Sequence, residues 1–243
     1  MPTTSSSLGS RARKLARFLK HPHVSIAFRI TRWRNRAAIL RAHRLLYRSG
    51  VPSKTRWFGA RLIKNPLDLW VYQELIYDIR PELIVETGTL DGGSAAYFAD
   101  ICELAGRGEV ISIDINPVSP DYPARPRITY LGGRSSADAD VVAEVRERAR
   151  GKKTMVVLDS DHSTEHVAAE IEAYAPLVSP GSYLIVEDTN IGLIFKEEWR
   201  HGPAEAVAAF LEHSDEFEAD LNCERYLITF HPGGFLRRRE QAQ

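Results

Sequence analysis

Acidic residues end four of the strands that the sequence predicts, and they are the side chains best placed to do chemistry. They are Glu86, Asp114, Asp159 and the adjacent pair Glu187 and Asp188. In open α/β sheets the carboxyl ends of the parallel strands share one edge, and ligands bind along that edge. We therefore expect these carboxylates to lie around a common site.

Three of these acids suggest a metal ion. Asp159, Glu187 and Asp188 end two apolar runs that are typical of adjacent strands. Crowded carboxylates repel one another, and their pKa values rise unless a cation neutralises them. A hard divalent ion with oxygen ligands meets this need, Mg²⁺ before Ca²⁺, and Asn190 could add a neutral oxygen. In the competing interpretation these acids cap helices and pair with Lys or Arg.

A histidine lies close to the expected metal ligands, in the segment Asp159-Ser-Asp-His162. Imidazole titrates near neutrality, so His162 is a candidate general base. His166 follows one helical turn later, and a His-x-x-x-His pair can bind zinc on a helix. The usual His-Glu-x-x-His order is missing, however, and the nearby groups are carboxylates. We therefore interpret His166 as a surface or supporting residue.

A glycine-rich turn follows the first buried strand. Gly88, Gly92 and Gly93 lack a Cβ atom, so the backbone can turn tightly there and approach a ligand closely. Ser94 is a candidate N-cap of a helix over residues 95–104, and the dipole of that helix favours an electron-rich ligand group. Strand, glycine turn and helix in this order are typical of a nucleotide or nucleoside site.

The spacing of this turn favours one ligand over others. It is neither the G-x-G-x-x-G of dinucleotide sites nor a phosphate loop ending in Gly-Lys-Ser/Thr. Glu86 before the first glycine suits a ligand with a cationic end, such as the amino group of S-adenosylmethionine (SAM). Asp114 lies roughly 20 residues beyond the turn, where an acid accepts ribose hydroxyls. The competing interpretations are a turn that binds nothing and an Asp114 that caps a helix or a turn.

The order of elements predicts an α/β fold. Apolar strands alternate with amphipathic helices, which favours a parallel sheet covered by helices. Asn65 and Pro66 predict the start of a further helix, and residues 217–221 and 225–230 predict an antiparallel pair near the carboxyl end. The expected strands span 83–87, 109–114, 128–131, 154–159 and 183–188, and the expected helices 95–105, 138–149, 164–176 and 203–212.

The amino-terminal quarter carries an unusual charge distribution. All sixteen charged residues before Asp68 are basic, and because the whole chain holds 32 basic and 32 acidic residues, the remainder has a net charge of −16. Helical spacing predicts an amphipathic extension from Arg11 to about Arg48, broken at His21-Pro22. This asymmetry is compatible with packing against the acidic domain of its own or a neighbouring subunit, with an anionic membrane surface, or with nucleic acid. No nucleic-acid module is recognisable, so we expect no nucleic-acid partner.

Composition narrows the class of protein further. A chain of 243 residues accommodates one α/β domain plus an extension. Two cysteines without C-x-x-C spacing argue against a disulfide scaffold or a zinc ribbon and fit the reducing cytoplasm. No apolar run approaches the ~20 residues that span a bilayer, and the start of the chain lacks the order of a secretory signal. We expect a cytoplasmic protein.

Several of these segments together resemble one family. They are the block from Arg56 to Glu74 (RWFGARLIKNPLDLWVYQE), residues 86–94 (ETGTLDGGS), Ile113-Asp114, residues 158–162 (LDSDH) and residues 186–188 (VED). The first block together with the ordered acids is more specific than the glycine motif alone. These residues resemble the cephalosporin hydroxylase / rhamnosyl O-methyltransferase family of SAM-dependent enzymes. The resemblance covers roughly residues 55–230.

The resemblance implies a doubly wound, Rossmann-like methyltransferase fold over residues 55–243, mostly parallel with an antiparallel carboxyl-terminal strand, preceded by a basic helical extension over residues 1–54. It implies SAM and Mg²⁺ as cofactors and a hydroxyl of a sugar, glycolipid or other natural product as the methyl acceptor. Homo-oligomers are also expected. The alternatives are hydroxylation, as in one of the family's names, and a non-catalytic protein that binds SAM or contacts a membrane through the basic extension.

The resemblance also implies roles for individual residues. Asp159 and His162 would be catalytic, with His162 as the base and Asp161 as a rival to Asp159 in the same loop. The cofactor-binding residues would be Glu86, Gly88, Thr89, Gly92, Gly93, Ser94 and Asp114, and the metal ligands Asp159, Glu187 and Asp188.

Overall fold

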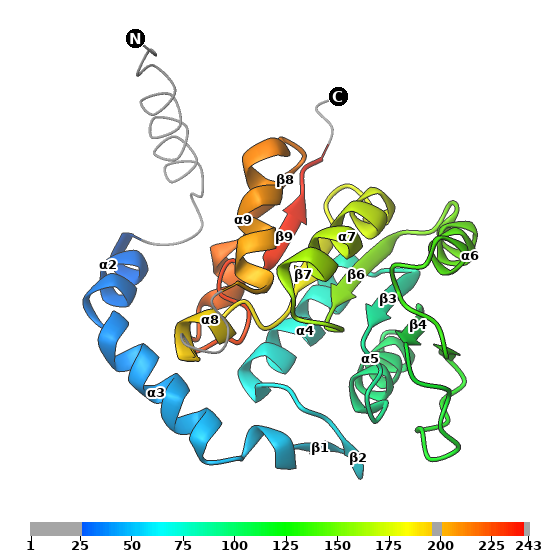
Figure 1. The fold of residues 1–243 in the computed structure, drawn as a ribbon, viewed down its shortest axis with the longest axis horizontal. Coiled ribbons are helices and arrows are strands. Elements are labelled where there is room, and N and C mark those ends of the chain that lie inside the picture. Colours follow the sequence, from blue (N-terminus) through cyan, green and yellow to red (C-terminus); the bar gives the residue numbers. More distant parts are fainter. Residues whose placement is uncertain (1–25, 196–200, 241–243) are drawn as a thin grey trace.

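A seven-stranded sheet forms the centre of the protein (Figure 1). In the computed structural model, which describes residues 26–195 and 201–240, its strands follow the order β5-β4-β3-β6-β7-β9-β8. Strands β3 to β7 pair in parallel, and β9 is antiparallel to both β7 and β8. The bounds are β3 Leu83–Thr87, β4 Glu109–Asp114, β5 Ile128–Gly132, β6 Thr154–Leu158, β7 Tyr183–Val186, β8 Phe217–Ala219 and β9 Phe235–Arg238.

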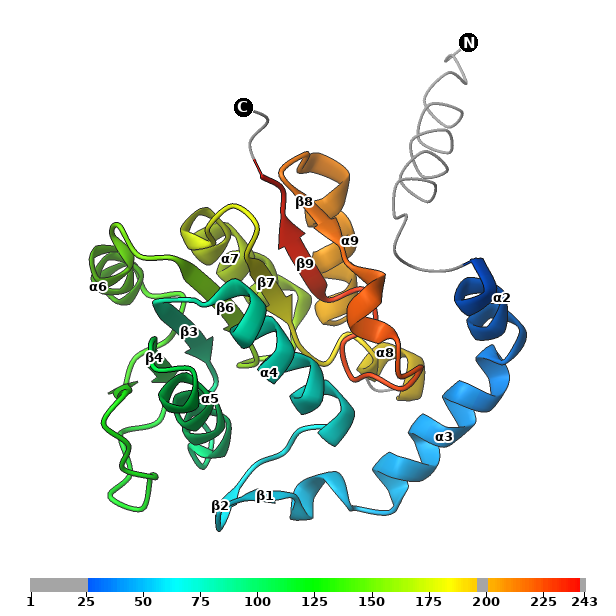
Figure 2. The ribbon, with the colours of Figure 1, turned by 180° about the vertical axis from the view of Figure 1, so that it is seen from behind.

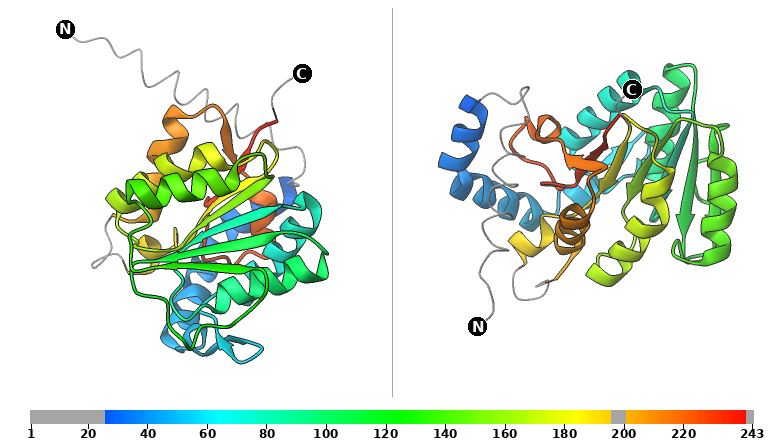
Figure 3. Two further views of the ribbon diagram at one scale, coloured as in Figure 1. Left: turned by 90° about the vertical axis from the view of Figure 1, so that its right-hand side faces the viewer. Right: turned by 90° about the horizontal axis from the view of Figure 1, so that it is seen from above.

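Helices cover both faces of this sheet, as the opposite views of Figures 1 and 2 and the left panel of Figure 3 show. The covering helices are α4 (Pro66–Ile79), α5 (Gly93–Leu104), α6 (Ala139–Ala149), α7 (Thr164–Tyr174) and α9 (Pro203–His213). A short helix, α8 (Ile191–Ile194), lies beyond the carboxyl end of β7, and short 3₁₀ turns lie at Pro52–Lys54, Ala175–Leu177 and Leu221–Glu224. A separate hairpin of β1 (Arg56–Trp57) and β2 (Ala60–Arg61) precedes α4.

Alternate residues of the strands feed two hydrophobic cores. In β3, Leu83 and Val85 join the cluster that packs against α6, α7 and α9, whereas Ile84 joins the cluster that packs against α4 and α5. A parallel strand buried on both faces needs this continuous apolar character. The predicted α/β fold, mostly parallel with an antiparallel strand near the carboxyl end, is therefore confirmed.

Asn65 and Pro66 start α4 as predicted: the Asn65 side chain accepts a hydrogen bond from the Leu67 N–H, and Pro66 occupies the first helical position. Helix α5, by contrast, begins at Gly93, two residues before the predicted start at residue 95. Its N-cap is Gly92 in a left-handed conformation, so Ser94 lies within the first turn and the prediction that Ser94 caps this helix is wrong.

The predicted antiparallel pair is right in type and wrong in position. Residues 217–219 do form a strand, but their partner is residues 235–238 and not 225–230. Leu227 adopts a left-handed conformation that interrupts an extended strand. The Phe230 N–H is bound by the buried carboxylate of Asp68, and the Phe230 carbonyl accepts from Asn190 N–H. The segment is thus tied to α4 and to the loop after β7.

Two helices precede this domain, α2 (Ile26–Arg34) and α3 (Arg36–Arg48), and α3 lies alongside α8 (Figures 1 and 2). The Arg32 guanidinium forms an ion pair with the buried Glu224 carboxylate. The basic segment therefore packs against the acidic part of its own chain, one of the three interpretations of its charge. The part predicted for residues 11–25 lies outside the described residues.

None of the helices in residues 26–195 and 201–240 combines the length and the apolar character needed to cross a membrane.

Candidate active site

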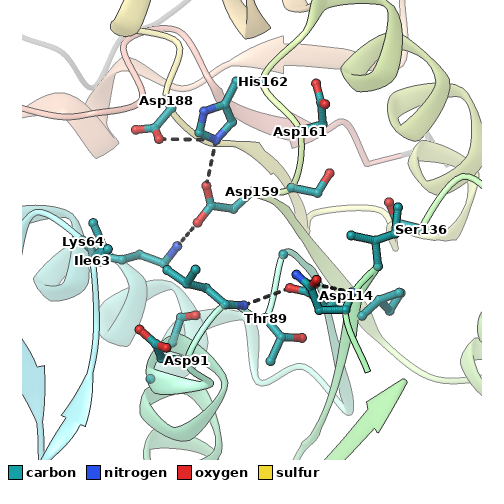
Figure 4. Close-up of a pocket in the computed structure, with 18 of the residues that line it drawn as sticks. Ile63, Lys64, Thr89, Asp91, Asp114, Ser136, Asp159, Asp161, His162 and Asp188 are labelled. Atoms are coloured by element: carbon teal, nitrogen blue, oxygen red, sulfur yellow. Dashed lines mark hydrogen bonds and ion pairs between the residues drawn. The ribbon is translucent and has the colours of Figure 1, made fainter. Parts of the chain in front are cut away.

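A cavity of about 570 Å³ opens at the carboxyl edge of the sheet, between the ends of β3, β4 and β6 and the segment after β2 (Figure 4). Its size falls within the range of small-molecule sites, ~300–1,000 Å³. Asp114 lies in one part of the wall, and Asp159, His162 and Asp188 lie together in another. The strand-end residues of the sequence analysis thus meet around one space.

Asp159, His162 and Asp188 form the charged cluster of this cavity. The His162 Nε2 lies 3.4 Å from an oxygen of Asp159 and 3.5 Å from an oxygen of Asp188. One ligand atom from each of the three side chains lies within 4.8 Å of the others, which is close enough to surround one metal ion. Asp159 and Asp188 come from the loops after β6 and β7, whose parallel pairing brings those loops together.

A buried lysine neutralises part of this cluster. The Lys64 side chain is 2% exposed, and its ammonium lies 2.5 Å from Asp159 Oδ2 and 2.8 Å from Glu187 Oε2. It reaches the cavity from the segment between β2 and α4. Buried charges persist when they are paired and hydrogen-bonded, and Lys64 meets that condition with two carboxylates.

These charges shift the ionisation of the whole cluster. Burial opposes the ionisation of Asp159, but the positive charges of Lys64 and His162 outweigh it and lower the pKa of Asp159 to about 2. Burial also opposes the imidazolium, yet the contacts with Asp159 and Asp188 raise the pKa of His162 to about 9. Burial, followed by the charge of Asp159, raises the pKa of Asp188 to about 6. With these contacts in place, a pKa of about 9 keeps the His162 imidazole protonated at neutral pH.

Glu187 faces away from the cavity. Its two oxygens accept hydrogen bonds from the Tyr72 hydroxyl at 2.7 Å and from the Lys64 ammonium at 2.8 Å, and the side chain is 3% exposed. Burial and the charge of Asp159 raise its pKa to about 7. The buried ring of His231 lies beyond it, with Nε2 at 3.6 Å from both Glu187 and Asp68. Among the described residues, the cluster that could hold a metal ion thus consists of Asp159, Asp188 and His162, whereas Glu187 was predicted as its third member.

The backbone at Asp188 is held in an unusual conformation. Asp188 has φ +53°, in the left-handed region that non-glycine residues rarely adopt, and its N–H donates to Nδ1 of His231 at 3.1 Å. Strained residues of this kind persist when their surroundings fix them, and they concentrate at functional sites. Here the turn directs the Asp188 carboxylate toward His162. Asn190, the proposed neutral oxygen ligand, is fully buried, and its Oδ1 lies 3.4 Å from the Tyr47 hydroxyl.

The two other candidates in the loop after β6 lie outside the cluster. Asp161 accepts a hydrogen bond from the Ser163 N–H at 2.7 Å, at the start of α7, and its side chain points away from Asp159 in Figure 4. His166 lies 3.5 Å from the buried Glu170 and 3.3 Å from the Ser136 hydroxyl, in another part of the cavity wall. The geometry thus favours Asp159 over Asp161 and does not pair His166 with His162.

The glycines of the turn make room for neighbouring backbone. A Cβ at Gly88 would lie 1.8 Å from the Asp159 carbonyl oxygen, and one at Gly93 would lie 1.9 Å from the Arg61 carbonyl oxygen. Gly92, with φ +73°, faces Pro123 and Tyr130. The close approaches that require glycine are therefore to the β6 loop and the β2 segment that form the cavity walls. Gly88 and Gly93 also line the cavity, whereas Gly92 does not.

Glu86 lies beneath this turn. It is fully buried, and one of its oxygens accepts a hydrogen bond from the Ser112 hydroxyl, which also lies 2.7 Å from Thr89 Oγ1. Burial raises the pKa of Glu86 to about 7. The cavity wall includes Thr89 and Ser94 but not Glu86. The prediction that Glu86 holds the cofactor's amino group thus rests on its strand-end position.

Asp114 is fixed at the opposite part of the cavity. Its Oδ2 accepts from the Leu90 N–H at 2.9 Å, and its Oδ1 accepts from the backbone and side-chain nitrogens of Asn116 at 2.8 and 3.0 Å. These bonds orient the carboxylate and leave it acceptor capacity toward the cavity that it lines. The role of Asp114 in binding the ribose of the cofactor stays a prediction.

Comparison with known proteins adds to this geometry. The family model "Rhamnosyl O-methyltransferase/CmcI" matches residues 49–239. The rhamnosyl O-methyltransferase of Mycobacterium leprae is 36% identical over 205 residues, which cover 81% of this chain and 89% of that protein. The rhamnosyl O-methyltransferase of Mycobacterium tuberculosis H37Rv is 36% identical over 203 residues, which cover 81% of this chain and 83% of that protein. The chain belongs to the rhamnosyl O-methyltransferase/CmcI family.

Solved structures agree with this assignment. The "CmcI-N160 apo-structure" has a TM-score of 0.59 at 26% identity and covers 77% of both chains. The structure "cmcI-N160 SAH" has a TM-score of 0.57 at 25% identity and covers 77% of this chain and 84% of that one. As a member of the family, the chain is a SAM-dependent O-methyltransferase.

Sequence reasoning missed three residues of this family member's site: Lys64, His231 and Tyr47. The signal for Lys64 was a lysine directly before the Asn65-Pro66 helix start, inside the first block of the resemblance. His231 and Tyr47 carried no local signal, because only the fold brings them to the loop after β7.

Proposed function

We propose that this methyltransferase transfers the methyl group of SAM to a hydroxyl of a sugar, or of a glycolipid or other natural product, with the help of Mg²⁺. The observation that carries this proposal is the cluster of Asp159, His162 and Asp188 in the wall of the cofactor cavity. The names of the mycobacterial relatives, rhamnosyl O-methyltransferases, support a sugar hydroxyl as the acceptor.

The donor set fits a divalent cation. Asp159 and Asp188 offer carboxylate oxygens, which Mg²⁺ prefers, and would hold the ion. The Lys64 ammonium lies between Asp159 and Glu187. If the metal ion displaced this ammonium, Glu187 would become a third ligand. A divalent cation bound here would lower the pKa of a coordinated acceptor hydroxyl.

His162 would act as the base. With Asp159 and Asp188 neutralised, the two contacts that raise the pKa of His162 weaken, and the imidazole can lose its proton near neutral pH. Its Nε2 then accepts the proton of the acceptor hydroxyl. The acceptor oxygen forms a bond to the methyl carbon while the bond from that carbon to sulfur breaks, and S-adenosylhomocysteine leaves.

Hydroxylation, the competing activity within the family's names, is less well supported by the ligand set. Non-haem iron oxygenases use two histidines and one carboxylate. The cluster found among the described residues instead has one histidine and two carboxylates.

Calorimetry tests this function directly. SAM is titrated into protein in the presence of a chelator, and the titration is repeated with Mg²⁺. We expect saturable one-site SAM binding and a separate Mg²⁺ heat. Asp188→Asn should keep SAM affinity within about threefold and lose the Mg²⁺ heat, because the variant removes one of two charged ligands. Absence of SAM binding under every condition would refute the proposal, and a Mg²⁺ heat unchanged in Asp188→Asn would refute the ligand assignment.

We further propose a peripheral membrane contact through the basic helices. Their exposed side chains include Trp33, which is 78% exposed, and a series of arginines: Arg34, Arg36, Arg41, Arg44 and Arg48. Arginines with an exposed tryptophan suit an anionic membrane surface. Co-sedimentation with phosphatidylserine vesicles, and its loss in a variant with Trp33 and the arginines replaced by glutamine, tests this contact. The homo-oligomer, the cytoplasmic location and a domain boundary at residue 54 stay predictions.

A further inference from the structure

The amino-terminal helix α3 reaches the catalytic cluster through one side chain. Tyr47, in its last turn, places its hydroxyl 3.5 Å from Asp188 Oδ1 and 3.4 Å from Asn190 Oδ1. The other oxygen of Asp188, Oδ2, lies 3.5 Å from His162. Asp188 is thus approached by a phenol on one oxygen and by an imidazole on the other, from two parts of the chain about 115 residues apart.

The ring of Tyr47 is fixed by packing. It lies edge-on to Phe195, with ring centroids 5.5 Å apart, and against the buried ring of Phe230 at 4.9 Å. Helix α3 itself contacts α8, the helix that follows Asp188 and Asn190. Aromatic pairs at these separations are favourable, so the two contacts stabilise the ring where its hydroxyl lies at the Asp188 loop.

The α2–α3 segment is also anchored away from the site. Arg32 of α2 forms an ion pair with Glu224, whose side chain is 2% exposed, and the other oxygen of Glu224 accepts from the Gly233 N–H at 2.8 Å. That glycine lies two residues after His231, whose ring accepts the Asp188 N–H. The helical extension is therefore connected to the Asp188 loop twice: directly through Tyr47, and indirectly through Arg32 and Glu224.

We propose that Tyr47 is a positioning residue for the metal ligand Asp188, so that the amino-terminal extension is part of the active site. The inference rests on the proposed divalent cation at Asp159 and Asp188. Tyr47 would donate its single proton to Asp188 Oδ1, which orients that carboxylate and leaves Oδ2 toward the cavity and His162.

The physical basis is the orientation of a ligand by an outer hydrogen bond. Carboxylates that bind metals are held by such partners, and loss of a partner typically weakens metal affinity by about 10- to 100-fold. Among the described residues, the Asp188 side chain is held by His162 and Tyr47, and its backbone by His231 and the Ile191 N–H. Removing the phenol proton leaves Oδ1 without this donor while the aromatic packing stays.

The test compares Tyr47→Phe with the matched control Tyr77→Phe. Both variants lose one phenol oxygen, but Tyr77 lies on α4 with 74% of its surface exposed. Mn²⁺ is the probe, and its binding to the full chain is followed by electron paramagnetic resonance and calorimetry. SAM affinity and the melting temperature are measured on the same samples. We expect Tyr47→Phe to weaken Mn²⁺ binding about tenfold, with SAM affinity within twofold of the original and the control unchanged.

Each contrary result has a distinct meaning. An unaltered chain that binds no Mn²⁺ overturns the metal site of the proposed function, and with it this inference. A chain that binds Mn²⁺ equally well with Tyr47→Phe overturns the inference alone. Equal losses of Mn²⁺ and SAM affinity in Tyr47→Phe overturn it as well, because they indicate a general structural effect.

Discussion

Replacing Lys64 by methionine should destabilise the cation-free protein strongly. The methionine retains the length and most of the volume of the stem, so the change removes chiefly the ammonium that lies 2.5 Å from Asp159 and 2.8 Å from Glu187. Removing one partner of a buried ion pair costs about 3–5 kcal/mol, because the remaining charge is left buried and unpaired. For a chain of this length that cost lowers the melting temperature by roughly 6–20 °C.

The pKa of Asp159 gives an independent estimate. It is lowered from an ordinary value of 3.8 to about 2 against the effect of burial, chiefly by the charge of Lys64. At about 1.4 kcal/mol per pKa unit, this amounts to about 2–3 kcal/mol at neutral pH. Because the folded pKa is depressed, that stabilisation is present above the unfolded pKa near 4 and is lost as the pH falls toward 2.

The loss in Lys64→Met should therefore depend on pH. Without the ammonium, the pKa values of Asp159 and Glu187 rise, so both are protonated in mild acid and the variant is penalised little there. At pH 7–8 the full cost applies. Mg²⁺ should restore part of the lost stability by binding to the folded state.

Thermal and urea unfolding at pH 5 and pH 8, in chelator and in Mg²⁺, measures these effects. Lys54→Met, at an exposed position, is the control and should change the free energy of unfolding by less than about 0.5 kcal/mol. A cost below about 1 kcal/mol for Lys64→Met, equal at both pH values, would refute the view that Lys64 neutralises the buried carboxylates.

Three further predictions concern the cofactor cavity and its base. Asp114→Ala should weaken SAM binding about 10- to 100-fold with or without Mg²⁺, since it removes a charged hydrogen-bond acceptor; calorimetry measures this, and an unchanged affinity would contradict the ribose assignment. Gly88→Ala should lower the free energy of unfolding by about 2–4 kcal/mol, because its Cβ would lie 1.8 Å from the Asp159 carbonyl oxygen. The control Gly233→Ala should lower it by only about 1–2 kcal/mol, because its Cβ meets open space and only the backbone at φ +80° is strained. Equal losses in urea unfolding would argue against the close approach at Gly88. In chelator, the imidazole of His162 should titrate near pH 9, as followed by NMR. The stability that its proton contributes is full below pH 6.5 and is lost as the pH rises through 9. Mg²⁺ should lower the titration midpoint, and a midpoint near pH 6.5 in chelator would show that the carboxylates do not stabilise the imidazolium.

The sequence predicted the parts of the site that depend on local pattern. A buried apolar run followed by an acid places a carboxylate at the end of a strand, and the parallel topology then brings the strand ends together. Asp114, Asp159 and Asp188 line the cavity for that reason. The helix start at Asn65 and Pro66 followed from capping chemistry in the same way.

The rest depends on which segments the fold brings together. Glu187 and Asp188 are adjacent in sequence and both follow β7, yet the left-handed turn at Asp188 sends one carboxylate into the cavity and leaves the other with Lys64 and Tyr72. Residues 225–230 were predicted as the partner strand of residues 217–219. They do not pair with it because the backbone of Phe230 forms hydrogen bonds with Asp68 and Asn190, two residues distant in sequence.

The uneven charge of the chain acquires a structural explanation from these contacts. Among the described residues, basic side chains of the first quarter pair at three places with acids that follow Asp68 in the sequence: Arg32 with Glu224, Arg61 with Asp91 at 2.7 Å, and Lys64 with Asp159 and Glu187. The last of these lies at the catalytic cluster itself. A domain with several carboxylates at one sheet edge would otherwise carry strong mutual repulsion. Lys64 therefore offsets part of the charge that a divalent-cation site requires, which ties the stability of the protein in chelator to the chemistry of its active site.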